Sequence, residues 1–124
     1  MKTLLAVILF VIVLIPVSLK AVCLKGDCEN GYGTETYSDG SKYIGTFKGG
    51  KQNGKGALIE PDGSKYVGQF KDGQLNGKGI LVRPNGIKYE GEFKNNKLNG
   101  HGALTSSNGK RITGIFKDGE LVNK

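Results

Sequence analysis

Aromatic and polar residues alternate along most of this chain in a pattern that returns every 23 residues. In one half of each copy Tyr, Gly and Phe occupy every second position, as at Tyr43, Gly45 and Phe47, with mainly polar residues between them. Successive side chains of a β-strand point to opposite faces, so the pattern predicts a strand with one aromatic face. Four segments follow this pattern, at residues 43–48, 66–71, 89–94 and 112–117.

Turn signals lie on both sides of each segment, because Gly, Asn and Asp supply the positive backbone angles of tight turns. One set of turns is expected at residues 39–40, 62–63, 85–86 and 108–109, and a second set at residues 49–50, 72–73, 95–96 and 118–119. Short connections make consecutive strands antiparallel neighbours. We therefore expect an all-β protein: an elongated single antiparallel meander sheet built from stacked 23-residue β-hairpin repeats.

The N-terminus follows a different pattern. Lys2 precedes an unbroken apolar run over residues 4–17, which predicts an N-terminal hydrophobic helix ahead of the sheet. Residues 1–21 would then be either a signal peptide, cleaved after Ala21, or a membrane anchor through residues 4–19. Both alternatives predict an exported protein, periplasmic or extracellular, if Lys2 stays on the cytoplasmic side.

Two elements at the 23-residue spacing, Tyr-x-Gly-x-Phe-Lys-x-Gly and Asn-Gly-x-Gly, resemble the MORN family, named for membrane occupation and recognition nexus. The resemblance places a MORN-repeat array in residues 22–124, with an opening half repeat at about 24–33 and further repeats to about 121. Two positions depart from the pattern, Ile112 in place of Tyr and Asn96 in place of Gly. The resemblance implies a scaffold or interaction module, which in some members associates with membranes or lipids.

Cys23 and Cys28 are the only cysteines, and they lie five residues apart in the opening half repeat. In an exported chain an even pair predicts a disulfide, which would fasten the first strand and contribute roughly 2 kcal/mol. The spacing is wider than a Cys-x-x-Cys redox motif, and a zinc site would need two further ligands. A lipid-modified Cys23 is a separate alternative, although the preceding residues fit a bacterial lipoprotein processing box poorly.

The 124-residue chain contains 21 glycines and has a formal net charge of +7, and basic residues recur in fixed columns of the repeat. One row comprises Lys42, Lys65, Lys88 and Arg111, and the other comprises Lys48, Lys71, Lys94 and Lys117. Such rows could meet an anionic membrane surface or an acidic polymer, or they could simply keep an extended sheet soluble. No nucleic acid is expected as a partner, because export would separate the protein from it.

The aromatic columns have two interpretations. Exposed on the sheet, they would form a binding face for a glycan, a cell-wall polymer or an extended peptide. Packed together, they would form the core and cover the strand glycines. In either case binding sites would be sheet faces and edges rather than pockets. The candidate residues are Tyr43, Phe47, Tyr66, Phe70, Tyr89 and Phe93.

Catalytic chemistry has little support in the sequence. His101 is the only histidine, and other copies have Tyr32, Lys55 or Lys78 in its column. No pair of carboxylates recurs between copies, so we expect no catalytic residue, no metal site and no cofactor. We interpret the chain as a non-catalytic exported or membrane-anchored repeat scaffold that mediates protein or membrane-surface interaction. The alternative is a glycan or cell-wall binding module that uses exposed aromatic columns.

Overall fold

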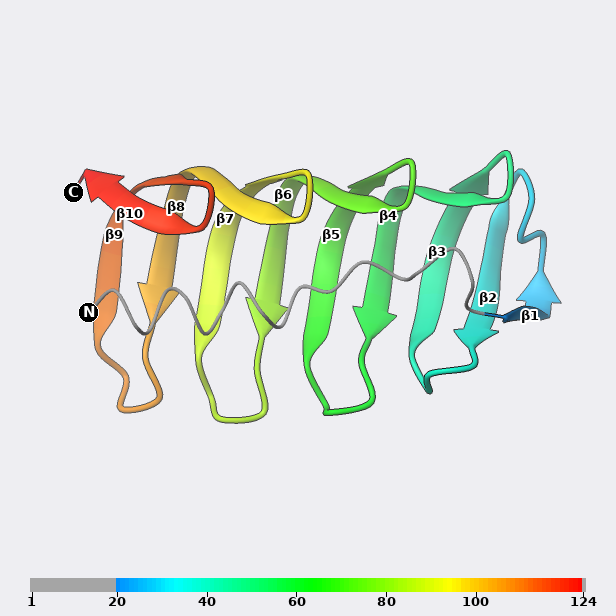
Figure 1. The fold of residues 1–124 in the computed structure, drawn as a ribbon, viewed down its shortest axis with the longest axis horizontal. Helices are drawn as coiled ribbons and strands as arrows, with labels where there is room; N and C mark the ends of the chain where they lie inside the picture. Colours follow the sequence, from blue (N-terminus) through cyan, green and yellow to red (C-terminus); the bar gives the residue numbers. More distant parts are fainter. Residues whose placement is uncertain (1–19, 124) are drawn as a thin grey trace.

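The computed structural model describes residues 20–123, which form one antiparallel sheet whose ten strands lie in sequence order (Figure 1). The strands are β1 (Ala21–Gly26), β2 (Tyr32–Tyr37), β3 (Lys42–Lys48), β4 (Lys51–Ile59), β5 (Lys65–Lys71), β6 (Gln74–Val82), β7 (Lys88–Lys94), β8 (Lys97–Thr105), β9 (Arg111–Lys117) and β10 (Glu120–Asn123). This arrangement confirms the all-β meander. The expected hydrophobic helix, with its anchor at residues 4–19, lies outside the described residues.

The turns along the upper edge of Figure 1 are two-residue hairpin connections with positive φ at both central positions. Asp72 and Gly73 have φ angles of 50° and 81°. Asn95 and Asn96 reach 51° and 70° without a glycine, because Asn tolerates the left-handed region better than other side chains. Two positive angles suit the right-handed twist of the flanking strands. The second set of expected turns is confirmed.

The loops along the lower edge differ from the expectation in one respect. In the loop after β4 only the glycine of the Asp-Gly pair has positive φ, which is 95° at Gly63. The Gly63 N–H donates a hydrogen bond of 3.0 Å to the Glu60 carbonyl, which closes a tight turn over residues 60–63. The centre of this turn lies one residue earlier than the expected Asp-Gly centre. Asp62 instead uses its side chain, since its Oδ1 accepts a hydrogen bond of 2.8 Å from the Ser64 N–H. The acidic residue therefore stabilises the loop by hydrogen bonding rather than by an unusual backbone angle.

A bulge bends each long even-numbered strand near its start. After the Gly68–Gly79 pair the register shifts, so that residues 76–78 of β6 lie opposite Gln69 alone. Gly77, with φ of 100°, takes the sharpest part of this bend. The same shift occurs between β3 and β4 and between β7 and β8. As a result the upper turns fold over one face of the sheet, as Figure 1 shows.

The core is a ladder of aromatic rings beneath these folded turns. Adjacent rings meet edge to face with centroids 4.9–5.1 Å apart, so each tyrosine contacts a phenylalanine of its own repeat and one of the next. All seven rings are at most 4% exposed. In order along the sheet they are Phe47, Tyr43, Phe70, Tyr66, Phe93, Tyr89 and Phe116. The core is thus a continuous stripe that links the repeats.

Each tyrosine of the ladder lies over a pair of glycines on neighbouring strands. The ring of Tyr66 covers Gly68 and Gly79, and a Cβ added at Gly79 would overlap the ring atoms. The Tyr66 hydroxyl donates a hydrogen bond of 2.9 Å to the carbonyl of Gln69, the residue opposite the bulge. The paired glycines, the tyrosine and the bulge therefore form one interdependent unit in each repeat.

A disulfide joins Cys23 of β1 to Cys28 in the following turn, with their Cα atoms 6.0 Å apart. This confirms the predicted pairing. Every residue of β1 is exposed, whereas Cys28 packs against the edge of the aromatic core. The bond therefore ties a strand with little burial of its own to the packed part of the sheet.

Replacing Gly79 by Ala should lower the free energy of unfolding by about 2 kcal/mol, because the new methyl group would collide with the Tyr66 ring. In a Tyr66→Leu background the same replacement should cost much less, since the ring atoms that it meets are gone. Denaturant unfolding of the two single variants and the double variant measures this coupling. An equal cost in both backgrounds would show that the ring does not require the glycine.

The Cys23→Ser/Cys28→Ser double variant should be less stable than the parent by roughly 2 kcal/mol, as expected for a closed loop of this size. Denaturant unfolding under oxidising conditions measures the difference. A reducing agent provides the control, since it should destabilise the parent by a similar amount and leave the variant unchanged. Equal stability of the oxidised parent and the variant would rule out a stabilising role for the bond.

Candidate functional site

The face of the sheet opposite the aromatic ladder, called here the outer face, is open to solvent. Alternation along β3 places Ile44 and Thr46 on this face, on the opposite side from Tyr43. Apolar side chains on it remain accessible, with exposed fractions of 47% for Val67 and 39% for Ile80. Adjacent exposed apolar side chains are typical of interaction surfaces, so the outer face is the candidate site.

Cross-strand pairing aligns the side chains of the outer face in rows along the sheet. The apolar row consists of successive partners on β3 to β6: Ile44, Ala57, Val67 and Ile80. The polar row lies two residues from the apolar row on each strand, on the side of the upper turns, and consists of Lys55, Gln69, Lys78, Glu92 and His101. Between the two rows runs a continuous line of strand glycines, of which Gly68 and Gly79 are one cross-strand pair.

An open trough of about 960 Å³ follows this line of glycines. The apolar row forms one wall, the polar row forms the other, and the backbone of the glycines forms the floor. Tyr32 lies at the N-terminal end of the trough and His101 at the C-terminal end. The trough is open and lies on the face of the sheet, so the expectation that binding sites would be sheet faces and edges rather than pockets stays a prediction.

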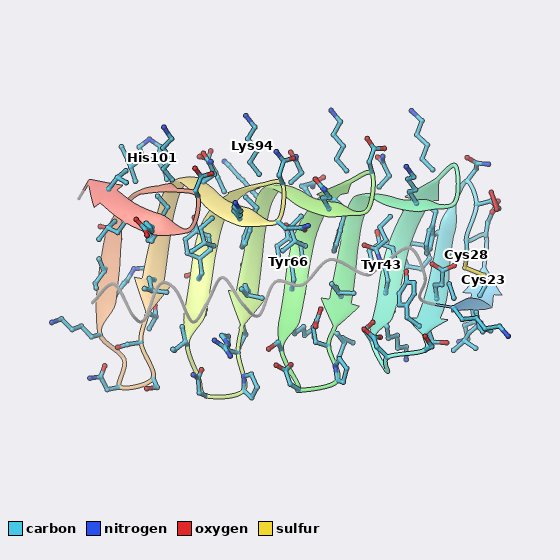
Figure 2. All side chains as sticks on the ribbon, in the orientation of Figure 1. Cys23, Cys28, Tyr43, Tyr66, Lys94 and His101 are labelled. Atoms are coloured by element: carbon cyan, nitrogen blue, oxygen red, sulfur yellow. A yellow bond between two sulfur atoms is a disulfide. The ribbon has the colours of Figure 1, made fainter. Side chains whose placement is uncertain are left out.

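The structure places both predicted basic rows on the outer face, one on each side of the trough. On β5 this face carries Lys65, Val67, Gln69 and Lys71 in that order. Lys65 and its counterpart Lys42 therefore border the apolar row, and Lys88 and Arg111 occupy the same column on β7 and β9. Lys71 and its counterparts Lys48, Lys94 and Lys117 lie next to the upper turns, where Lys94 extends past the edge of the sheet in Figure 2.

Acidic side chains reduce the charge of these rows in places. The Glu90 Oε1 atom lies 3.7 Å from the Lys88 Nζ and 3.3 Å from an Arg111 guanidinium nitrogen. One carboxylate therefore pairs with two members of the row that borders the lower loops. In the row next to the upper turns, Asp72 directly follows Lys71 and Asp118 directly follows Lys117. Neither row is an unbroken line of positive charge. Exposed ion pairs of this kind contribute at most about 1 kcal/mol each.

The aromatic columns do not form an exposed binding face, so the first interpretation of them is wrong and the second, a packed core, is the one that the structure has. Tyr43, Tyr66, Tyr89, Phe47, Phe70 and Phe93 are all at most 4% exposed. The folded upper turns cover their rings, and the strand glycines provide the space in which the tyrosine rings lie (Figure 2). A glycan or peptide therefore has no access to these rings in the folded sheet.

Burial determines the ionisation of the tyrosines. Loss of solvent raises the pKa of Tyr43 and of Tyr89 to about 12. The pKa of Tyr66 is also raised, again mainly by burial. These phenols stay protonated at neutral pH, so each hydroxyl can donate its hydrogen bond to the carbonyl opposite the bulge.

Glu60, in the lower loop between β4 and β5, has a perturbed pKa. Partial burial is the largest cause, and the negative charges of Asp62 and Asp39 add to it, so that the pKa of Glu60 rises to about 7. This position is far along the strand from the trough, which Glu60 does not line. We therefore assign Glu60 to stability and not to binding.

Sequence reasoning missed the residues that line the trough. The variable third residue of Asn-Gly-x-Gly lines the trough at Lys55, Lys78 and His101. The sequence alone suggested only that this column is an exposed part of a strand. The period-2 alternation already placed Val67 on the outer face, but only the pairing register shows that a polar wall lies across from it. Within residues 20–123, no cluster of three or more His, Cys, Asp or Glu side chains is arranged to hold a metal ion.

The stacked hairpins, the shared aromatic stripe and the repeated bulge define a linear β-repeat protein with a single-layer sheet. The sequence model of the MORN repeat family matches residues 29–42, 43–65, 66–88 and 89–111, which together make up more than half of the chain. The chain therefore belongs to the MORN repeat family. Repeats of this family are scaffolds for interaction with proteins or membranes. A comparison with curated proteins gave no match, and the described residues include no helix long and apolar enough to cross a membrane.

Glu60 should make stability depend on pH. Its pKa is higher in the folded chain, about 7 against 4.5, so the folded state binds the proton more tightly. Its favourable contribution is complete below pH 4.5 and is lost as the pH rises to about 7. We expect a loss on the order of 1 kcal/mol, reduced because the side chain is partly solvated. Urea unfolding between pH 4 and 8 measures this loss.

The Glu60→Gln variant should remove most of this pH dependence, because its side chain does not titrate. Glu120→Gln provides a matched control, since it removes a carboxylate from exposed strand β10 and leaves the lower loops intact. Parallel stability profiles for the parent and Glu60→Gln would contradict the assignment.

Proposed function

We propose that this protein is a non-catalytic, exported scaffold that presents the outer face of its sheet to a partner protein. The observation that carries the proposal is the trough, in which exposed apolar side chains such as Val67 and Ile80 line one wall and lysines line the other. A protein partner can match both walls at once, because protein surfaces combine apolar and charged groups at this scale. A solvent-facing sheet without a partner would gain little from exposing them.

Export is supported by two features of the chain. The disulfide between Cys23 and Cys28 favours an oxidising compartment, where such bonds persist. The apolar run at residues 4–17 behind Lys2 has the layout of a signal peptide or an anchor. We propose that residues 1–21 direct the array to the periplasm or cell exterior, either cleaved or retained as an anchor through residues 4–19.

A membrane surface is the other partner class that the family allows. The basic rows would supply the attraction, but Asp72, Asp118 and Glu90 interrupt them. A flat bilayer would also meet the rims of the outer face before the floor of the trough. The hollowed geometry therefore favours a protein over a lipid surface as the principal partner.

Position-specific crosslinking in cells that express the protein natively tests this proposal. A photoreactive residue at Val67, in the trough, should yield a discrete adduct with another protein. The same residue at Asn108, an exposed position in the last lower loop, is the matched control and should yield much less. Fractionation of the same cells should recover the full chain, or its processed form, in the exported or membrane fraction.

Two outcomes would overturn the proposal. Equal adduct formation at positions 67 and 108 would mean that the trough has no special role. Salt-sensitive binding of the full chain to anionic vesicles, together with no protein adduct at position 67, would make the membrane surface the partner instead.

A further inference from the structure

Charge is distributed unevenly along the trough. In the half over β3 to β6 six lysines lie on the outer face, and none forms a salt bridge within residues 20–123: Lys42, Lys48, Lys55, Lys65, Lys71 and Lys78. In the half over β7 to β9, Glu90 pairs with Lys88 and Arg111. Glu92 accepts a hydrogen bond of 2.9 Å from the His101 N–H. One half is thus basic and forms no internal ion pair, whereas the other contains carboxylates, of which Glu92 lies opposite Lys78 at the boundary between the halves.

The basic half also contains the apolar row. One wall is formed by Ile44, Val67 and Ile80. This wall lies between Lys42 and Lys65 on one side and the polar row with Lys55 and Lys78 on the other. A ligand that fits must offer apolar groups to this wall and anionic groups to the lysines. Acidic protein segments with interspersed apolar residues have this chemistry, whereas a simple inorganic anion does not.

The spacing of the repeat fits an extended peptide. Lys55 and Lys78 lie on β4 and β6, two strands apart, which corresponds to roughly 9.6 Å in a sheet. Three residues of a polyproline II segment, at about 3.1 Å per residue, span roughly 9.3 Å, and its three-residue turn returns the side chain to the same side. A segment in this extended conformation that runs along the trough, across the strands, can therefore present a carboxylate to each lysine from every third residue.

We propose that the half of the trough over β3 to β6 binds an extended acidic segment of a partner protein. Apolar side chains of the segment pack on Ile44, Val67 and Ile80, and its carboxylates pair with Lys55 and Lys78. Glu90 and Glu92 repel acidic residues beyond this point, so the acidic part of the segment ends near β7. This inference rests on the proposed function and adds the chemistry of the partner to it.

Selection of random 12-residue peptides on the immobilised full chain, in non-ionic detergent, tests the inference. The selected peptides should be at least two-fold enriched in Asp and Glu over the starting library. Synthetic copies with Asn or Gln at each acidic position should bind at least ten-fold more weakly in fluorescence anisotropy at low salt. The affinity of the acidic peptides should fall steeply as salt is added, because these contacts are exposed to solvent.

A matched pair of variants locates the binding. The Lys55→Glu/Lys78→Glu variant should weaken the acidic peptides at least ten-fold. The Lys25→Glu/Lys117→Glu variant makes the same change in net charge at exposed positions outside the trough, and it should change affinity less than two-fold. Thermal unfolding of both variants checks that the aromatic core is intact, because none of these lysines contributes to it.

Three outcomes would overturn the inference: no enrichment, enrichment of basic or neutral peptides, or equal effects of the two charge variants. A fourth is binding of the full chain to phosphatidylglycerol vesicles that depends on Lys55 and Lys78 while no peptide is selected, which would make a lipid the occupant. The scaffold proposal is judged separately by crosslinking at Val67. An adduct there with no acidic selection would preserve the scaffold and reject the acidic segment.

Discussion

The contact between a tyrosine ring and two facing glycines is the interaction on which the rest of this structure depends. The Tyr66 ring can lie flat over Gly68 and Gly79 only because neither residue has a Cβ, and the two strands approach closely at that point. The ring then reaches the Gln69 carbonyl, which lies opposite the bulge, and donates a hydrogen bond to it. Without that donor, a partly buried carbonyl would lose its partner. Aromatic packing, backbone hydrogen bonding and strand bending are thus coupled in each repeat.

The glycine line also lies beneath the opposite face. On the aromatic side it makes room for the rings, and on the outer side its backbone is the floor between two walls of side chains. The trough therefore runs along the back of the aromatic core. On the proposed function, selectivity has to come from the walls, where the polar row changes from Lys78 to Glu92 and His101 while the floor stays glycine. Fold and binding surface are specified by different columns of one 23-residue unit.

Local features of the fold could be predicted from the sequence, whereas the shape of the site could not. The alternation of aromatic and polar residues predicted that Tyr43 and Phe47 share one face, and the pair of cysteines predicted a disulfide. The bulge carries no comparable signal, because three residues opposite one is a property of the pairing and not of either strand alone. Yet the bulge decides that the upper turns cover the aromatic face. The sequence therefore left open whether the rings or the outer face meet solvent, and with it the location of the trough.

The linear arrangement separates folding from recognition to a degree that compact domains rarely permit. Each repeat contacts only its neighbours, so stability is approximately a sum of local terms along the array. Lys55 and Lys78 lie outside the aromatic core, and a change of charge at either position leaves the ring ladder unaltered. On the proposed function, a substitution on a wall alters recognition without altering the floor beneath it. For the acidic segment proposed above, the order of charged residues along the array then sets the order of charges that the segment carries.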